Sequence, residues 1–246
     1  MKYVGFALLG ILALILLVIV FICVAALFVN PRKDYDRNSR FYRFIMDFVS
    51  AATLWLLRVR IHVSGMERVP LDRKCLYVGN HRSNFDSIVT WKVFRRQQLA
   101  YLSKGENFKL FVVGRIVRRC CFMAIDRENA RNAMNTINRA ARLLGEGEVS
   151  IGVYPEGTRS KTKVLLPFHG GVFKIAQKAK APIVVLAIRG CEDIHKHRPF
   201  GATDVYLDVV DVMMPEDIEK VRSRVLSDRA RTAIDEHLKK QEGTGV

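Results

Sequence analysis

An apolar run at the start of the chain is its strongest constraint. Residues Val4–Val29 contain no charged side chain, and 19 of these 26 residues are Leu, Ile, Val or Phe. As a helix the run is about 39 Å long, whereas a bilayer core needs only about 20 such residues. At roughly 0.3–0.6 kcal/mol per residue, insertion is favoured by about 6–11 kcal/mol. We therefore expect residues 1–30 to form a transmembrane anchor, which Asn30–Pro31 ends.

A cleaved secretory signal is the competing interpretation of this run. The run is about twice as long as the usual apolar region of a signal, and no convincing small-x-small cleavage site precedes a polar segment. A lipoprotein signal is excluded as well, because Ile22 precedes Cys23 where a small residue is expected. A retained anchor is favoured.

The distribution of charge predicts the orientation of this anchor. Only Lys2 precedes the apolar run, whereas five basic residues follow it closely: Arg32, Lys33, Arg37, Arg40 and Arg43. The positive-inside rule then places the rest of the chain in the cytoplasm, at the inner membrane if the organism is bacterial. With 39 basic and 24 acidic residues, residues 31–246 carry a net charge of +15. Such a domain is suited to anionic lipid headgroups or to nucleic acid.

Residues 31–63 are predicted to form a juxtamembrane helical segment. From Phe41 to Val63, aromatic and aliphatic residues alternate with Arg and Asp, and Asp47 makes a second span unfavourable. A pair of helices at the membrane interface, near the headgroups, is favoured. A soluble helix that packs on the following domain is the alternative.

Residues 64–246 are predicted to form a single α/β domain. Short β-rich runs alternate with helical patterns of 10–17 residues, which is typical of a mixed, largely parallel sheet flanked by helices. The expected strands are Cys75–Gly79, Cys120–Ile125, Val149–Tyr154, Ile183–Ile188 and Val205–Val210. The expected helices are Phe85–Phe94, Glu128–Leu144, Gly171–Lys178 and Pro215–Lys240.

A polar turn, Asn80–Asp86, directly follows the first of these strands. His81 and Asp86 diverge if both lie on one helix, but they meet if His81 lies in the turn and Asp86 in the first turn of the helix. The carboxylate then fixes the imidazole tautomer and stabilises the imidazolium, which makes a general base. Alternatively, Ser83 and Asp86 form a helix-capping motif, and His81 is an ordinary turn residue.

A second polar turn, Tyr154–Ser160, follows another predicted strand. Pro155 and Gly157 favour a tight turn, and the planar guanidinium of Arg159 is suited to a phosphate. Glu156 either accepts a hydrogen bond from a substrate hydroxyl or holds the amides of the turn. A surface turn with solvated charges is the alternative, but ligands gather at strand ends of α/β sheets.

These two turns resemble motifs of the glycerolipid acyltransferases, most closely those of the 1-acylglycerol-3-phosphate acyltransferases. The NHxSxxD motif stands as Asn80–Asp86, and the [FY]PEGTRS motif as Tyr154–Ser160. Gly114 with Phe122–Arg127 resembles the second motif, and Ala181–Val185 the fourth. The resemblance covers about residues 74–188. His169 departs from the family pattern, since many members carry Lys there.

The resemblance implies the chemistry of the protein. His81, oriented by Asp86, deprotonates the free hydroxyl of a lysophospholipid, which attacks an acyl thioester of coenzyme A or acyl carrier protein. The acceptor is 1-acyl-sn-glycerol 3-phosphate and the product phosphatidic acid; another lysophospholipid or glycerol 3-phosphate is the alternative acceptor. The expected phosphate-binding residues are Arg127, Glu156, Gly157, Thr158 and Arg159.

Neither a cofactor nor a metal is expected beyond the acyl thioester co-substrate. A thioester is already activated, so a base and positioning suffice. His195 and His197 lie in a polar loop, where a metal site is disfavoured. Cys120 and Cys121 are expected to be packed rather than catalytic. A nucleic-acid partner is not expected, because basic and aromatic residues are not interleaved and no helix-turn-helix pattern is present.

Overall fold

The computed structural model describes residues 2–196 and 201–243. These residues form a seven-stranded sheet in the order β1-β7-β6-β2-β5-β3-β4. The strands are β1 (Val59–Ser64), β2 (Leu76–Gly79), β3 (Leu99–Ser103), β4 (Met123–Ala124), β5 (Ser150–Val153), β6 (Ile183–Arg189) and β7 (Thr203–Met213). The five strands from β6 to β4 are mutually parallel, whereas β7 is antiparallel to β6 and parallel to β1. The predicted α/β class with a mixed, largely parallel sheet is confirmed.

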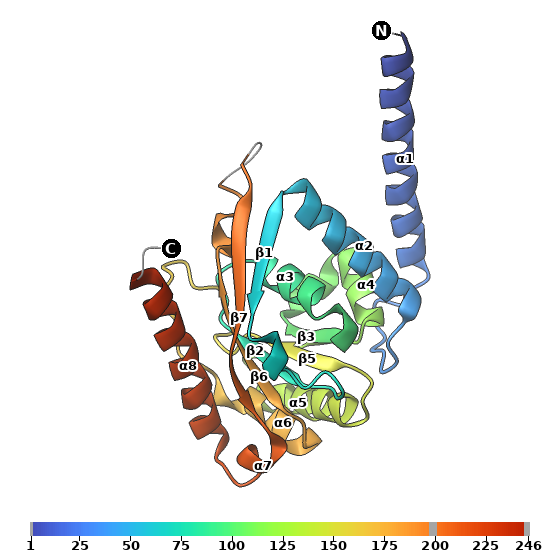
Figure 1. Cartoon of the computed structure of the whole chain (residues 1–246). Coiled ribbons are helices and arrows are strands. Elements are labelled where there is room, and N and C mark those ends of the chain that lie inside the picture. The colour runs from blue at the N-terminus through green and yellow to red at the C-terminus, as the bar shows by residue number, and fades with distance from the viewer. Residues whose placement is uncertain (1, 197–200, 244–246) are drawn as a thin grey trace.

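Helices cover both faces of this sheet (Figure 1). Helices α5, α6 and α8 pack on one face, and α2, α3 and α4 pack on the other. The α-helices are α1 (Lys2–Leu27), α2 (Arg40–Leu56), α3 (Phe85–Val93), α4 (Val113–Arg119), α5 (Ala130–Gly145), α6 (Lys174–Ala179), α7 (Pro215–Ile218) and α8 (Ser223–Gly243). Short 3-10 helices are η1 (Met66–Arg68), η2 (Arg95–Gln97), η3 (Gly105–Lys109), η4 (Gly170–Phe173) and η5 (Cys191–Asp193).

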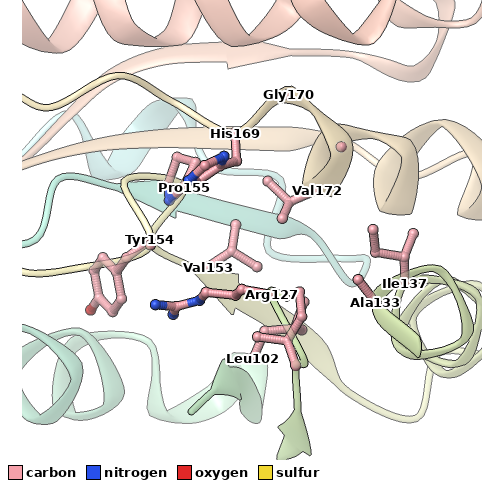
Figure 2. A pocket seen from close by; sticks show the side chains of 13 residues that line it. Leu102, Arg127, Ala133, Ile137, Val153, Tyr154, Pro155, His169, Gly170 and Val172 are labelled. Carbon is pink, nitrogen blue, oxygen red and sulfur yellow. The ribbon is translucent and has the colours of Figure 1, made fainter. Parts of the chain in front are cut away.

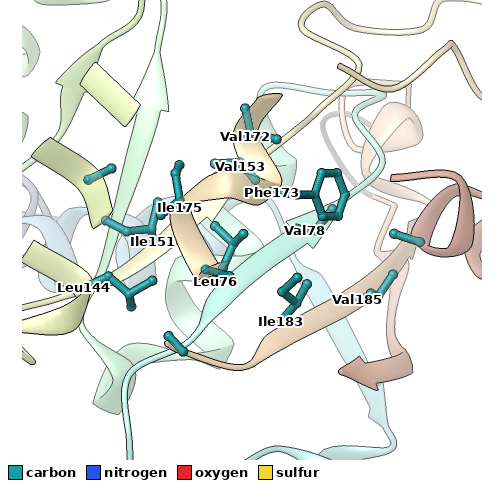
Figure 3. Close-up of a cluster of buried hydrophobic side chains, with 14 of the residues drawn as sticks. Leu76, Val78, Leu144, Ile151, Val153, Val172, Phe173, Ile175, Ile183 and Val185 are labelled. Carbon is teal, nitrogen blue, oxygen red and sulfur yellow. The ribbon is translucent and has the colours of Figure 1, made fainter. Parts of the chain in front are cut away.

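Strand β6 shows why the sheet is buried on both sides. Ile183, Val185 and Ala187 belong to the core under α5, α6 and α8 (Figure 3). The residues between them point to the opposite face, because side chains alternate along a strand, and they join the core under α2 and α3. A strand that is apolar at every position therefore needs a helical layer on each face.

Helix α1 stands away from the sheet and its helices (Figure 1). The most apolar 18-residue window of its residues Tyr3–Leu27 has a mean hydropathy of 3.4, and none of that window is buried. Its C-terminal end packs on the domain: Phe21 meets Phe41 edge to face, and Ala25 and Ala26 are buried. The Tyr42 hydroxyl donates a hydrogen bond of 2.9 Å to the Ala25 carbonyl. The predicted apolar helix is confirmed, and it is long enough to cross a membrane.

The segment between α1 and the domain differs from the predicted helix pair. Helix α2 is a single helix, and Val59–Ser64 form β1, an edge strand of the sheet. The sheet therefore begins within the segment 31–63 that was predicted to be helical. Arg43, expected near headgroups, is instead 6% exposed, and its guanidinium donates to the Leu99 carbonyl. Strand β1 pairs with β7, which lies over 140 residues later, so its partner is invisible in the local pattern.

Three other elements differ from the prediction. Strand β3 was not predicted, and β4 comprises only Met123–Ala124 because α4 continues to Arg119. The predicted helix Pro215–Lys240 is divided into α7 and α8. The Gln177 side-chain amide donates to the carbonyls of Ile218 and Val221 at 2.8 and 2.7 Å, which satisfies the backbone at this break.

Candidate active site

The two polar turns lie side by side because their strands are neighbours. Strands β2 and β5 pair in parallel, so the turns that follow Gly79 and Val153 lie at the same edge of the sheet. The backbone joins them directly, since the Ser160 amide donates a 2.8 Å hydrogen bond to the His81 carbonyl. Two segments over 70 residues apart thus build one site.

His81 and Asp86 are in contact. The Asp86 Oδ2 atom lies 2.8 Å from His81 Nδ1, and the Asp86 side chain is 1% exposed. The same oxygen accepts hydrogen bonds from the backbone amides of Arg82 and Ser83, each at 2.8 Å. Asp86 lies in the first turn of α3, as the orienting arrangement requires. The Ser83 amide contact is also half of a capping box, so the alternative interpretation holds in part.

The imidazole of His81 is held on one side and open on the other. Its ring stacks on Tyr154, with centroids 4.4 Å apart and an interplanar angle of 13°. In the described part of the chain Nε2 makes no hydrogen bond, and 19% of the side chain is exposed. The Asp86 contact makes Nδ1 the donor, which leaves the Nε2 lone pair available to accept a proton.

Asn80 fixes the start of this turn. Its side-chain amide donates to the Ile188 carbonyl and its side-chain oxygen accepts the Ile188 amide, both at 2.8 Å. The turn is thereby tied to the end of β6, the neighbour of β2 on the other side. Asn80 thus serves to hold the backbone of the turn in place.

Glu156 binds backbone amides of the site. Its two carboxylate oxygens accept the amides of His81 at 2.6 Å and Leu166 at 2.9 Å, and the residue is 4% exposed. Of the two roles considered for it, the structure favours holding the turn. Burial raises the pKa of the Glu156 carboxyl, although both amide hydrogen bonds oppose the shift.

A pocket of about 320 Å³ lies beside the second turn (Figure 2). Tyr154, Gly157, Arg127 and His169 line its polar part, and the remaining wall is mainly apolar, with Leu102, Ile125, Ile137, Val153 and Val172. Gly157 has φ +73°, and a Cβ there would lie 3.2 Å from the His169 ring and 3.7 Å from the Arg127 guanidinium carbon. Glycine therefore lets two nitrogen-rich side chains converge on one point.

The predicted phosphate-binding residues thus separate into three groups. Arg127 and Gly157 line the pocket, Glu156 is buried beneath the turn, and Thr158 and Arg159 are exposed outside the pocket lining. Among the described residues, none makes a hydrogen bond or ion pair with the Arg159 side chain, so its guanidinium is available to a ligand.

His169 is a pocket residue that the prediction of the site omitted. Its amide donates to the Pro155 carbonyl at 2.8 Å, which ties it to the second turn. The signal for it was the departure from the family pattern at this position.

The cysteine pair Cys120–Cys121 is buried, and within residues 2–196 and 201–243 the described part of the loop with His195 belongs to no metal-binding cluster. Cys120 and Cys121 are fully buried, and burial raises the pKa of their thiols to about 12 and about 11. These described residues contain no group of three or more His, Cys, Asp or Glu side chains arranged to hold a metal. His197 of the His195–His197 pair lies outside them.

Comparison with known proteins agrees with this geometry. A family model described as Acyltransferase matches residues 60–189, which is more than half of the chain. The chain belongs to the acyltransferase family. The match begins at β1 and ends with β6, so it includes both turns and the strands that carry them.

Several acyltransferases of known sequence resemble the chain. The 1-acyl-sn-glycerol-3-phosphate acyltransferase of Haemophilus influenzae is 30% identical over 155 residues, which cover 61% of this chain and 63% of that protein. The human 1-acyl-sn-glycerol-3-phosphate acyltransferase alpha is 26% identical over 182 residues, which cover 73% and 64%. The match therefore spans about three fifths of these relatives.

A solved acyltransferase structure shares the fold. The crystal structure of the 1-acyl-sn-glycerophosphate (LPA) acyltransferase PlsC from Thermotoga maritima superposes with a TM-score of 0.63 at 22% identity. The similarity covers 79% of this chain and 78% of that one, and it supports the layered sheet described above.

Proposed function

We propose that this acyltransferase transfers a fatty acyl group from an acyl thioester to the sn-2 hydroxyl of 1-acyl-sn-glycerol 3-phosphate. The names of the related proteins support this acceptor. The observation that carries the reaction is His81, whose Nδ1 contacts a buried carboxylate and whose ring stacks on Tyr154, a residue of the pocket lining. The product is phosphatidic acid, a precursor of phospholipids.

The reaction needs one base and one acyl donor. His81 Nε2 takes the proton of the acceptor hydroxyl while the hydroxyl oxygen attacks the thioester carbonyl carbon. The C–S bond then breaks, and the thiolate of coenzyme A or acyl carrier protein takes the proton back from the imidazolium. Asp86 stabilises that imidazolium, because its carboxylate is buried 2.8 Å from Nδ1. The donor's activated carbonyl makes a protein nucleophile unnecessary.

The acceptor phosphate is assigned to the cationic groups around the second turn. Arg127 lines the pocket and Arg159 is exposed outside its lining, and both offer planar donors to phosphate oxygens. Gly157 and Thr158 directly precede Arg159 in the turn. The apolar remainder of the pocket is suited to hydrocarbon, since its wall consists mostly of aliphatic side chains.

Membrane attachment follows from the same substrate. Helix α1 is long and apolar enough to cross the bilayer, and we infer that the domain lies on the cytoplasmic side, where the basic flank after the helix belongs. Helix α2 adds large apolar side chains on its exposed face, among them Phe44 and Trp55, which suit the membrane interface. Acceptor and product both reside there.

A lysolipid panel tests this function. Purified membranes that contain the chain are incubated with labelled acyl-CoA or acyl carrier protein and with lysophosphatidic acid, lysophosphatidylcholine, lysophosphatidylglycerol or glycerol 3-phosphate. We expect phosphatidic acid labelled at sn-2 as the main product, formed about 10²–10⁴-fold more slowly by a His81→Ala control. Preferred labelling of another acceptor would replace the acceptor but keep the chemistry, whereas no acyl product from any acceptor would refute both.

A further inference from the structure

Three exposed apolar side chains lie close together in the chain, near the C-terminal end of α1. Leu110, Phe111 and Val113 are 53%, 55% and 49% exposed, and we name them the apolar tip. They lie between η3 and the first residues of α4. An exposed apolar cluster of this kind marks a contact surface when the backbone holds it in place.

The backbone of the tip is held firmly. The Gly114 amide donates to the Leu110 carbonyl at 2.9 Å, and the Ile116 amide to the Val112 carbonyl at 3.1 Å. A Cβ on Gly114 would lie 2.5 Å from the Phe108 carbonyl oxygen, so only glycine permits this close approach. The buried ring of Phe108 anchors η3 below the tip.

Contacts place the tip at the level where α1 ends. The guanidinium of Arg115 lies 4.4 Å from the centre of the Phe111 ring, and it also donates to the Ala26 carbonyl in the last turn of α1 at 3.4 Å. Further along α4, the Arg119 carbonyl accepts the Ser39 amide at 2.9 Å, and Arg118 pairs with Asp34 at 3.0 Å. Helix α4 is thus joined to the chain that leaves α1.

The charges beside the tip suit an anionic lipid surface. Lys104, Lys109 and Arg115 lie within six residues of it, and Glu106 is the one acidic residue of this stretch. Cationic groups that flank apolar side chains are the pattern of an interfacial membrane contact, because the apolar groups enter the acyl boundary while the cations meet phosphates.

We propose that the apolar tip inserts into the interface of the leaflet from which α1 emerges, as a further membrane contact beside α1 and the exposed face of α2. The proposal rests on the membrane placement of α1 proposed above. Each further contact reduces the freedom of the domain to tilt about α1 and so helps to fix its orientation. The tip joins the sheet through η3 and β3, and β3 supplies Leu102 to the pocket, so insertion holds the pocket near the lipid surface.

Photocrosslinking in the full chain tests the contact without relying on activity. The photoreactive residue p-benzoylphenylalanine replaces Phe111, and the protein is reconstituted into vesicles of phosphatidylcholine and phosphatidylglycerol. Ile15 in α1 and Val225 in α8 are matched comparison positions, because both are 51% exposed. We expect lipid adducts at position 111 at least about tenfold above position 225, as for a side chain within the acyl boundary.

Each other outcome overturns the proposal in a distinct way. Labelling at position 15 but only background at 111 would leave the anchor intact and refute the tip contact. Background at both positions would refute the membrane placement itself. Adducts at 111 with a second protein chain instead of lipid would assign the tip to a protein interface. None of these outcomes depends on which lysolipid is acylated.

A substitution gives the functional consequence. The triple variant Leu110→Gln, Phe111→Gln, Val113→Gln should lose about tenfold in turnover of lysolipid in vesicles, because the pocket loses its position at the surface. Turnover of a water-soluble short-chain acceptor should stay unchanged, as should both activities of Val225→Gln. Equal loss on both acceptors would show a merely structural role and contradict the proposal.

Discussion

The same contact, a histidine 2.8 Å from an aspartate, occurs at two different places on the sheet. His81 meets Asp86 at the end of β2, and His62 meets Asp204 at the exposed edge formed by β1 and β7. In the first pair the carboxylate is 1% exposed and also accepts two backbone amides. In the second it is 35% exposed, and its other oxygen accepts Arg60 at 2.6 Å.

The difference explains why His81 and not His62 is proposed as the base, although both histidines lie at the same distance from an aspartate. Asp204 is solvated and already paired with a cation, and hydrogen bonds from His62 and Arg60 lower its pKa. Its interaction with an imidazolium is therefore screened by water. Asp86 is shielded and fixed by its amide donors, and a pocket lies beside the ring of Tyr154 on which His81 stacks. Burial, fixed geometry and a neighbouring pocket distinguish the two pairs.

The largest effect is expected from removing the two histidines in turn. His81→Ala should lower turnover by about 10²–10⁴-fold, the usual contribution of a general base. His62→Ala should leave turnover within about twofold, since its pair is an exposed salt bridge. Acyl transfer rates at equal amounts of folded protein measure both. Near-normal turnover in His81→Ala would remove the base from the mechanism.

The next largest effect on turnover is expected from replacing Asp86, whereas the same substitution of Asp204 should have none. Asp86→Asn keeps the size of the side chain but removes its charge and replaces one acceptor oxygen by a donor. We expect turnover to fall about 10- to 100-fold through loss of imidazolium stabilisation. Asp204→Asn, the matched control, should leave it unchanged. Equal rates for the two variants would mean that the buried environment of Asp86 has no catalytic consequence.

Substitution of the arginines around the second turn tests which residues bind the phosphate of the acceptor. Arg127→Ala and Arg159→Ala should each raise the KM for the phosphorylated acceptor about tenfold, which corresponds to about 1.4 kcal/mol, while kcat changes little. Arg131→Ala, on the exposed face of α5, is the control. A rise confined to the acyl-donor KM would move the phosphate elsewhere, and a rise in only one variant would identify which side of the turn binds it.

The smallest effect on turnover is expected from Glu156→Gln, which acts on stability. The Gln side chain has only one acceptor oxygen, so it loses one of the two hydrogen bonds from the His81 and Leu166 amides. The free energy of unfolding should therefore fall by about 1–3 kcal/mol. Urea unfolding measures this, with the exposed Glu128→Gln as the control.

The pH dependence of that loss follows from the raised pKa of Glu156. Because the folded state holds this proton more tightly than the unfolded state, stability contributed by the protonated carboxyl is present at low pH and declines as pH rises through the raised pKa. Gln cannot titrate, so the difference between the wild-type chain and Glu156→Gln should be larger near pH 4.5 than at pH 7. A difference that grows with pH would show that burial does not dominate the environment of Glu156.

The sequence alone determined the features whose cause is local. The apolar run makes α1 a helix suited to a bilayer wherever the rest of the chain lies. The turn after β2 was predicted to bring His81 to Asp86 because the two are only five residues apart, one in the turn after the strand and the other in the first turn of the helix. Strand β6 was predicted because six consecutive residues in it, Ile183–Ile188, are apolar.

The tertiary structure decided whatever depends on partners far along the chain. Strand β1 exists because β7 pairs with it, and Arg43 is buried because the Leu99 carbonyl accepts its guanidinium. The Glu156 carboxylate accepts hydrogen bonds from the His81 and Leu166 amides, which the fold brings to it from other parts of the chain. Such contacts are formed by residues that only the assembled sheet brings together, and the convergence of Arg127 and His169 over Gly157 is the one on which the assignment of the pocket depends.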